Sequence, residues 1–127
     1  MRSRILCISG DPDDAQTLSQ MLHSLPVVLE HADNLKQARI RLFQRPYDAV
    51  LTESKLPDGN WMDVLHLVRE SPYETQLIVT DPHADSQLWS EVLNFGAYDV
   101  VPQPFYEPEV RRILYNACTR DAAVLAM

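Results

Sequence analysis

The chain is poor in glycine, with only three among its 127 residues. Loops that hold nucleotide phosphates are rich in glycine, because their backbone must approach the phosphate closely. Cysteine is also scarce, and Cys7 and Cys118 lie far apart without forming a C-x-x-C pair. A dinucleotide or P-loop site is therefore unsupported, and we expect both thiols to be reduced and packed.

The sequence also lacks the features of a membrane protein or a nucleic-acid-binding protein. It has no run of about 18 apolar residues to span a bilayer, and its N-terminus leads directly into a short strand-like run. Acidic residues outnumber basic residues by 18 to 11, for a formal net charge of −7. Since such a chain is repelled by nucleic acids and anionic membranes, we expect a cytoplasmic domain that binds neither directly.

Short apolar runs alternate five times with segments of helical periodicity. Continuous apolar runs are typical of parallel strands that are covered on both faces. Gly96 is placed to end the fourth helix and Pro108 to begin the fifth. The pattern predicts an α/β fold with three layers, namely a doubly wound five-stranded parallel sheet in the flavodoxin-like order 2-1-3-4-5. The expected strands are residues 4–8, 27–30, 49–52, 77–80 and 99–101.

Residues 1–127 are expected to form a single domain with its own core. No linker, internal repeat or low-complexity tract divides the chain. Residues 122–127 have the composition of a helix. We therefore expect a C-terminal helix that can continue into an output domain outside this sequence.

The stretch from Tyr47 to Asn60 is the most informative part of the chain. Its apolar strand ends in a single carboxylate, Glu53, and then breaks into the turn Leu56-Pro57-Asp58-Gly59. Open parallel α/β sheets place their functional residues at the carboxyl ends of the strands. Glu53 is therefore the first candidate for a functional side chain.

With other scaffold features, this stretch resembles the receiver domain of bacterial two-component response regulators, over nearly the whole chain. The resemblance implies the CheY-like form of the fold and a role in phosphorelay signalling. The matching features are Ile5-Leu6-Cys7-Ile8, Asp11-Pro12, Tyr47-Asp48, Leu56-Pro57-Asp58-Gly59, Leu77-Ile78-Val79-Thr80, Gly96-Ala97 and Pro104-Phe105.

Receivers of that family transfer a phosphoryl group to an aspartate after the third strand. An acidic pair after the first strand holds Mg²⁺, and a hydroxyl residue and a lysine contact the phosphoryl oxygens. Of these positions the chain retains only the hydroxyl, at Thr80. Ser9 and Gly10 stand at the acidic pair, Glu53 at the acceptor and Gln103, ahead of Pro104, at the lysine.

Each replacement weakens the chemistry that the resemblance implies. Gly10 has no side chain to offer a metal, and the adjacent Asp11 lies one residue beyond the ligand positions. Glu53 is one methylene longer than aspartate, in a reaction that depends on exact placement. Gln103 can donate a hydrogen bond but cannot neutralise a phosphoryl group. We therefore expect no bound Mg²⁺ and no catalytic residue.

Several further expectations concern the surroundings of the site. Asp13 and Asp14 are expected to begin the first helix as capping or dipole-stabilising residues. Glu53 either imitates the phosphorylated state, or bonds to the hydroxyl of Thr80, or is a solvated loop carboxylate.

The fifth strand carries the position at which the family has an aromatic switch residue. Val100 occupies this position and is too short for the same rotamer change. Tyr98, two residues earlier, is expected on the same strand face and is the candidate substitute. The bond between Gln103 and Pro104 is one that the family usually has as cis.

We expect a non-enzymatic, degenerate receiver, or pseudo-receiver, that acts on an output domain or partner protein through contacts. One alternative is a working receiver with Glu53 as phospho-acceptor and Asp11 recruited for Mg²⁺. Another is a flavodoxin-like small-ligand module that uses the crevice at the carboxyl edge. The fourth and fifth helices are expected to support a homodimer. The interface candidates are Trp89, Leu93, Arg111 and Arg112.

Overall fold

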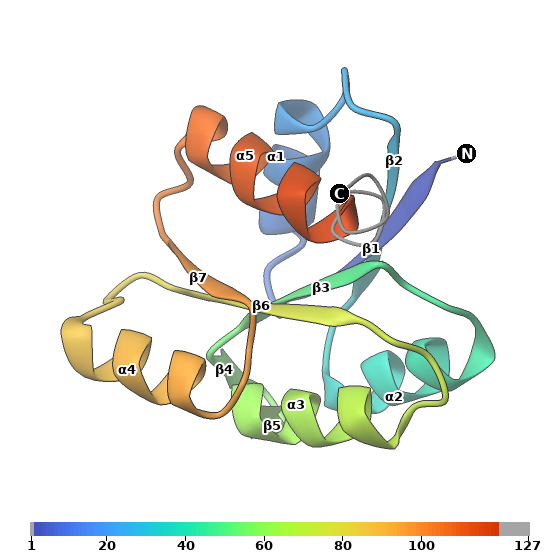
Figure 1. Ribbon diagram of the computed structural model, residues 1–127, viewed down its shortest axis with the longest axis vertical. Helices are drawn as coiled ribbons and strands as arrows, with labels where there is room; N and C mark the ends of the chain where they lie inside the picture. The colour runs from blue at the N-terminus through green and yellow to red at the C-terminus, as the bar shows by residue number, and fades with distance from the viewer. Residues whose placement is uncertain (1, 120–127) are drawn as a thin grey trace, which may run out of the picture.

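A computed structural model describes residues 2–119 as a parallel sheet with helices on both faces (Figure 1). The strand order is β2-β1-β3-β6-β7, which is the predicted order 2-1-3-4-5 when only these five strands are counted. The predicted three-layer, doubly wound α/β fold is confirmed. The expected C-terminal extension lies outside the described residues. The strands are β1 Ser3–Ile8, β2 Val27–Ala32, β3 Ala49–Glu53, β6 Gln76–Asp81 and β7 Asp99–Pro102.

Five helices cover the two faces of this sheet. Helices α1 and α5 lie on one face, and α2, α3 and α4 lie on the other (Figure 1). Within residues 2–119, no helix is long and apolar enough to cross a membrane. The helices are α1 Pro12–Met21, α2 Leu35–Gln44, α3 Trp61–Glu70, α4 Ser86–Asn94 and α5 Glu107–Cys118.

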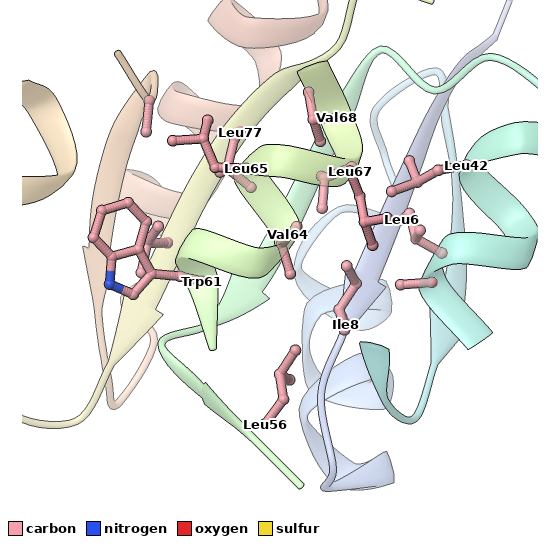
Figure 2. Packing of buried hydrophobic residues seen from close by; sticks show 14 of the residues in the cluster. Leu6, Ile8, Leu42, Leu56, Trp61, Val64, Leu65, Leu67, Val68 and Leu77 are labelled. Atoms are coloured by element: carbon pink, nitrogen blue, oxygen red, sulfur yellow. The ribbon is translucent and has the colours of Figure 1, made fainter. Parts of the chain in front are cut away.

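The core consists of two apolar clusters, one on each face of the sheet. Leu6 and Ile8 of β1 point into the cluster beneath α2, α3 and α4 (Figure 2). Ile5 and Cys7 alternate with them and join the cluster beneath α1 and α5. Because both faces of each strand are buried, the strands appear in the sequence as continuous apolar runs.

The helix ends follow the sequence signals, with one change at α1. The Asp11 side chain accepts from the backbone N–H of Asp13 at 3.0 Å and is the N-cap, whereas Asp13 and Asp14 lie in the first turn. Gly96 follows α4 with φ +93°, which favours glycine, and it ends the helix as predicted.

A short hairpin between β3 and α3 was not predicted. Strands β4, Lys55–Leu56, and β5, Gly59–Asn60, pair antiparallel. A Cβ atom at Gly59 would lie 2.7 Å from Oδ2 of Asp63 and 2.9 Å from Cδ2 of Leu35. The hairpin therefore packs closely against α2 and α3 at residue 59, and a side chain there would require Asp63 and Leu35 to shift.

Tyr98 and Val100 lie on opposite faces of the sheet, so the prediction that they share a face was wrong. Val100 belongs to the cluster beneath α2, α3 and α4, and Tyr98 packs against the cluster beneath α1 and α5. Strand β7 begins only at Asp99. Tyr98 therefore lies before the strand in which side chains alternate between the two faces of the sheet. It cannot replace the family's aromatic switch residue on the face of Val100.

Candidate functional site

The carboxyl ends of β1, β3, β6 and β7 bring the predicted site residues to one edge of the sheet. Glu53 ends β3, and Thr80 stands beside it in the register of β6. Gln103 follows β7, and its bond to Pro104 is cis. A cavity of about 190 Å³ opens at this edge. It is lined by Glu53, Ser54, Lys55, Thr80, Asp81, Pro82 and Gln103.

Glu53 is held by Ser9, which is buried at the end of β1. The hydroxyl of Ser9 donates to Oε1 of Glu53. The backbone of Ser9 is fixed in turn, because its N–H donates to the carbonyl of Ala32 at 3.0 Å. Nε2 of His31 donates to the carbonyl of Ser9 at 2.8 Å. The residue at one acidic-pair position thus binds the residue at the acceptor position directly.

The position of His31 at this site was not predicted, although one signal for it exists. The parallel register pairs His31 of β2 with Cys7 of β1, two residues before Ser9. A histidine at the end of the neighbouring strand is therefore within reach of the β1–α1 loop. The prediction that β2 neighbours β1 was sufficient to place it there.

Two carboxylates converge on the hydroxyl of Ser9. Its oxygen lies 2.9 Å from Oδ2 of Asp14 and also contacts Glu53. A hydroxyl has one proton and can donate to only one acceptor at a time. The ion pairs found among residues 2–119 involve neither carboxylate. Negative charge therefore accumulates here without a paired cation.

Gln103 joins the same group from β7. Its Nε2 donates to Oδ2 of Asp14 at 3.4 Å, a long and weak hydrogen bond. This amide stands where the family has a lysine, and it supplies a dipole but no charge. Asp14, which was expected only to begin α1, therefore also connects Ser9 with Gln103.

Thr80 does not bond to Glu53, so this expectation was wrong. Its Oγ1 is buried and has no hydrogen-bond partner among the described residues. β3 lies between β1 and β6, and the long side chain of Glu53 is bound to Ser9, which follows β1. Thr80 is left as an unpaired hydroxyl residue lining the cavity.

On the other side of the cavity, Asp81 and Ser54 form a separate pair. The hydroxyl of Ser54 donates to Oδ2 of Asp81. Oδ1 of Asp81 accepts from the backbone N–H of His83 at 2.6 Å, so the residue also opens the turn after β6. The role of Ser54 was not predicted, because serine is common in loops and carries no distinctive signal.

The site does not fit the metal centre that the family resemblance implies. In residues 2–119, no group of three or more histidine, cysteine, aspartate or glutamate side chains converges to hold a metal ion. Asp11 caps α1, and Gly10 offers no side chain. Of the other oxygens near Glu53, the carboxylate of Asp14 contacts the neutral hydroxyl of Ser9, and the carboxylate of Asp81 accepts from Ser54.

The free thiol of Cys7 lies on β1, close to this negative charge. Burial raises the pKa of Cys7 to about 12, and the charges of Asp14 and Glu53 act in the same direction. Burial likewise raises the pKa of Cys118, also a free thiol, to about 11. Both residues are therefore thiols and not thiolates near neutral pH.

The four interface candidates do not form one free surface. Leu93 is 47% exposed on α4, and Arg112 is exposed on α5. Trp89 is partly buried against the core. Arg111 donates from Nη1 to the carbonyl of Met21 at 3.0 Å and thereby ties α5 to α1. Arg111 is thus already engaged within the chain.

Comparison with known families and curated proteins identifies relatives of this chain. A family model for the response regulator receiver domain matches residues 5–115. The response regulator protein PilR of Pseudomonas aeruginosa is 25% identical over 116 residues, which cover 91% of this chain and 26% of PilR. The signal transduction histidine-protein kinase BarA of Escherichia coli K12 is 22% identical over 112 residues, which cover 87% of this chain and 12% of BarA. The chain thus spans about a quarter of PilR and less of BarA.

Solved structures agree on the fold. The receiver domain of a putative LuxO repressor protein from Vibrio parahaemolyticus superposes with a TM-score of 0.88 at 19% identity, covering 99% of this chain and 98% of that one. The receiver domain of the sensor histidine kinase PA1611 from Pseudomonas aeruginosa has a TM-score of 0.80 at 22% identity, covering 93% and 97%. That structure contains a magnesium ion coordinated in its active-site cleft.

Proposed function

The chain belongs to the response regulator receiver domain family, and on this basis we propose that it is a pseudo-receiver. It is a signalling module that is not phosphorylated in the usual way. It regulates a fused output domain or a partner protein through contacts. The observation that carries this proposal is the bond from Ser9 to Glu53 at a site where glutamine stands at the position of the family's lysine and no metal-ligand group is found among residues 2–119.

Electrostatics oppose phosphoryl transfer at this edge of the sheet. Transfer to a carboxylate is catalysed by positive charge on the phosphoryl oxygens, which the family supplies through Mg²⁺ and lysine. A phosphoryl group on Glu53 would instead add negative charge beside Asp14, and the neutral Gln103 offers only a weak dipole. We therefore propose that the domain works without Mg²⁺.

Glu53 serves as a fixed internal anion in this proposal. Its carboxylate contacts the hydroxyl of Ser9 at the end of β1, and the same hydroxyl oxygen lies 2.9 Å from Oδ2 of Asp14 at the start of α1. The Ser9 proton can be donated to only one of these carboxylates at a time. A domain held in one arrangement in this way transmits signals by binding and release of partners.

The contact surface for this signalling is proposed on α4 and α5. Leu93 and Phe95 are exposed at the end of α4, and Tyr115 is exposed on α5. Arg112 adds a positive charge there. A second copy of the chain or an output domain that covers these residues would remove their apolar surface from water.

Intact-mass spectrometry after incubation with acetyl phosphate and Mg²⁺ tests the proposal. We expect no phosphoryl adduct on the unmodified chain or on Glu53→Asp alone. The variant Gly10→Asp/Glu53→Asp/Gln103→Lys, called the restored variant, has the residue types of the receiver family at these three positions. It is expected to gain one phosphoryl group. The site has room for the first change, because a Cβ atom at Gly10 would lie 3.4 Å from Cγ of Pro57.

Two controls make the result specific. Omission of Mg²⁺ should abolish the adduct on the restored variant, and Glu53→Gln shows the background of other residues. An adduct on the unmodified chain that disappears in Glu53→Gln would overturn the proposal. The chain would then be a working receiver with Glu53 as its acceptor.

A further inference from the structure

The outer face of α2 carries a stripe of four exposed residues, Lys36, Arg39, Ile40 and Phe43. Their spacing of three, four and seven residues places them on one side of the helix. Ile40 is 51% exposed and Phe43 is 43% exposed. The opposite side of α2 is buried in the core, so this face has no partner within the described chain.

The charge of this region is opposite to that of the whole chain. Residues 34–47 contain four basic residues and no aspartate or glutamate, although the chain has a net charge of −7. Arg41 and Arg45 pair with Glu30 at 3.0 and 3.4 Å. Lys36 and Arg39 have no ion pair within residues 2–119. Two cations that form no ion pair within residues 2–119 thus lie beside two exposed apolar side chains.

A groove of about 260 Å³ adjoins the stripe. Leu35 and Leu67 line it, together with Lys36, Arg39 and Asp58. Asp58 forms no ion pair with these cations within residues 2–119, and its carboxylate accepts from the backbone N–H groups of Leu35 and Lys36 at 2.8 and 3.1 Å. The first of these hydrogen bonds is the main cause that lowers the pKa of Asp58.

We propose that this α2 face is a docking surface for an acidic amphipathic helix of a partner protein. Apolar side chains of that helix pack on Ile40, Phe43 and the adjoining groove, and its carboxylates pair with Lys36 and Arg39. The exposed stripe runs over about 10 Å of helix, which matches anchor residues one and two turns apart on a partner helix.

The charges decide between this occupant and a second copy of the chain. A two-fold symmetric dimer would place the same α2 face on both sides, and Lys36 and Arg39 would then oppose their own copies. An acidic partner removes this repulsion. The inference does not depend on whether Glu53 is phosphorylated, because the groove beside α2 and the carboxyl-edge cavity have no lining residue in common.

Titration with designed peptides tests the proposal. The probe is a helical peptide of about 16 residues with leucines one and two turns apart and flanking glutamates. A control peptide keeps the leucines and replaces each glutamate by lysine. We expect the acidic peptide to bind the full chain, with amide shift changes by NMR in α2 and at Leu67, and the basic peptide to bind at least about tenfold more weakly.

Variants on the surface sharpen this test. We expect two double variants to bind the acidic peptide about tenfold more weakly or worse than the unmodified chain. They are Lys36→Glu/Arg39→Glu and Ile40→Ser/Phe43→Ser. Because these four side chains are exposed, the variants should retain the melting temperature of the unmodified chain. Leu93→Ser/Arg112→Glu changes the α4 and α5 face instead and should leave the affinity unchanged.

Three outcomes would overturn the inference. One is no saturable binding of the acidic peptide, and another is equal binding of both peptides. The third is concentration-dependent dimerisation that Ile40→Ser/Phe43→Ser abolishes, since this would assign the face to a second copy of the chain. Loss of affinity in Leu93→Ser/Arg112→Glu alone would place peptide binding elsewhere and would equally contradict it.

Discussion

Two glutamates of the same sheet have opposite surroundings. Glu53, at the carboxyl end of β3, meets the neutral hydroxyl of Ser9 beside a second carboxylate. Glu30, in the edge strand β2, is only 15% exposed and is surrounded by donors. Its partners are the guanidinium groups of Arg4, Arg41 and Arg45 and the hydroxyl of Tyr47.

The pKa of Glu30 reflects this difference. Burial alone would raise it, but the hydrogen bonds from Tyr47 and Arg4, with the charges of Arg4 and Arg45, outweigh burial and lower the pKa. Three arginines therefore stabilise a partly buried carboxylate. Arg4 lies on β1, Arg41 on α2 and Arg45 directly after α2, and none of them is paired at the position where the receiver family uses its metal and lysine.

The side chains around Glu30 are paired with one another, whereas not all of those around Glu53 have a partner among the described residues. The Glu30 cluster joins β1, β2, α2 and the segment before β3, and each member has a charged or hydroxyl partner. The Glu53 site keeps an unpaired hydroxyl at Thr80 and unneutralised carboxylates. Glu30 is therefore held by ion pairs, whereas no ion pair among residues 2–119 involves Glu53.

The largest expected effect is on stability, from Glu30→Ala. Removing this carboxylate leaves three guanidinium groups without their partner and takes away the acceptor of the Tyr47 hydroxyl. We expect a loss of about 1–2 kcal/mol in the free energy of unfolding, because the arginines are partly exposed. Urea denaturation measures it, and Glu53→Ala is the matched control with a loss below about 1 kcal/mol. Equal losses would remove the distinction between the two sites.

The next effect is the dependence of stability on pH. The pKa of Glu30 in the folded chain lies below the ordinary value of 4.5. As pH falls, the unfolded chain therefore takes up this proton first. The contribution of Glu30 to stability is complete above about pH 5 and is lost as pH falls through its lower folded pKa.

Glu30→Gln should remove this part of the acid sensitivity. Urea denaturation between about pH 6 and pH 3 should give a flatter stability profile for the variant than for the unmodified chain. Glu53→Gln serves as the control for removing a carboxylate as such. If Glu30→Gln leaves the acid limb of the profile unchanged, the arginines do not stabilise the charged form of Glu30.

The fold was predictable because each strand is buried on both faces, which leaves a continuous apolar run in the sequence. The β4–β5 hairpin was not, since two-residue strands carry no periodicity. The positions of Glu53 and Gln103 followed from the resemblance to receivers. The Glu30 cluster could not be predicted in this way, because it joins residues that are distant in sequence and shows no local pattern.

The direction in which Glu53 points shows why contacts are harder to predict than positions. β3 has a neighbouring strand on each side, so both Ser9 and Thr80 end next to Glu53. The sequence places both hydroxyls within reach of one long carboxylate. Only the packed arrangement of the loops decides that Ser9 is the donor and that Thr80 is left unpaired.

The smallest expected effects are the couplings of Glu53 with these two hydroxyls. In double-mutant cycles of unfolding free energy, Glu53→Gln with Ser9→Ala should show a coupling of about 0.5–1 kcal/mol. Glu53→Gln with Thr80→Val should be additive within about 0.3 kcal/mol, because no hydrogen bond joins the two residues.

Thr80→Val alone provides the internal check. It removes a buried hydroxyl that has no partner, so the variant should be as stable as the unmodified chain or more stable by up to about 1 kcal/mol. A destabilised Thr80→Val that is also coupled to Glu53→Gln would mean that Glu53 turns toward β6 in solution. Ser9 would then no longer be its donor, and the proposed internal anion would lose its connection to α1.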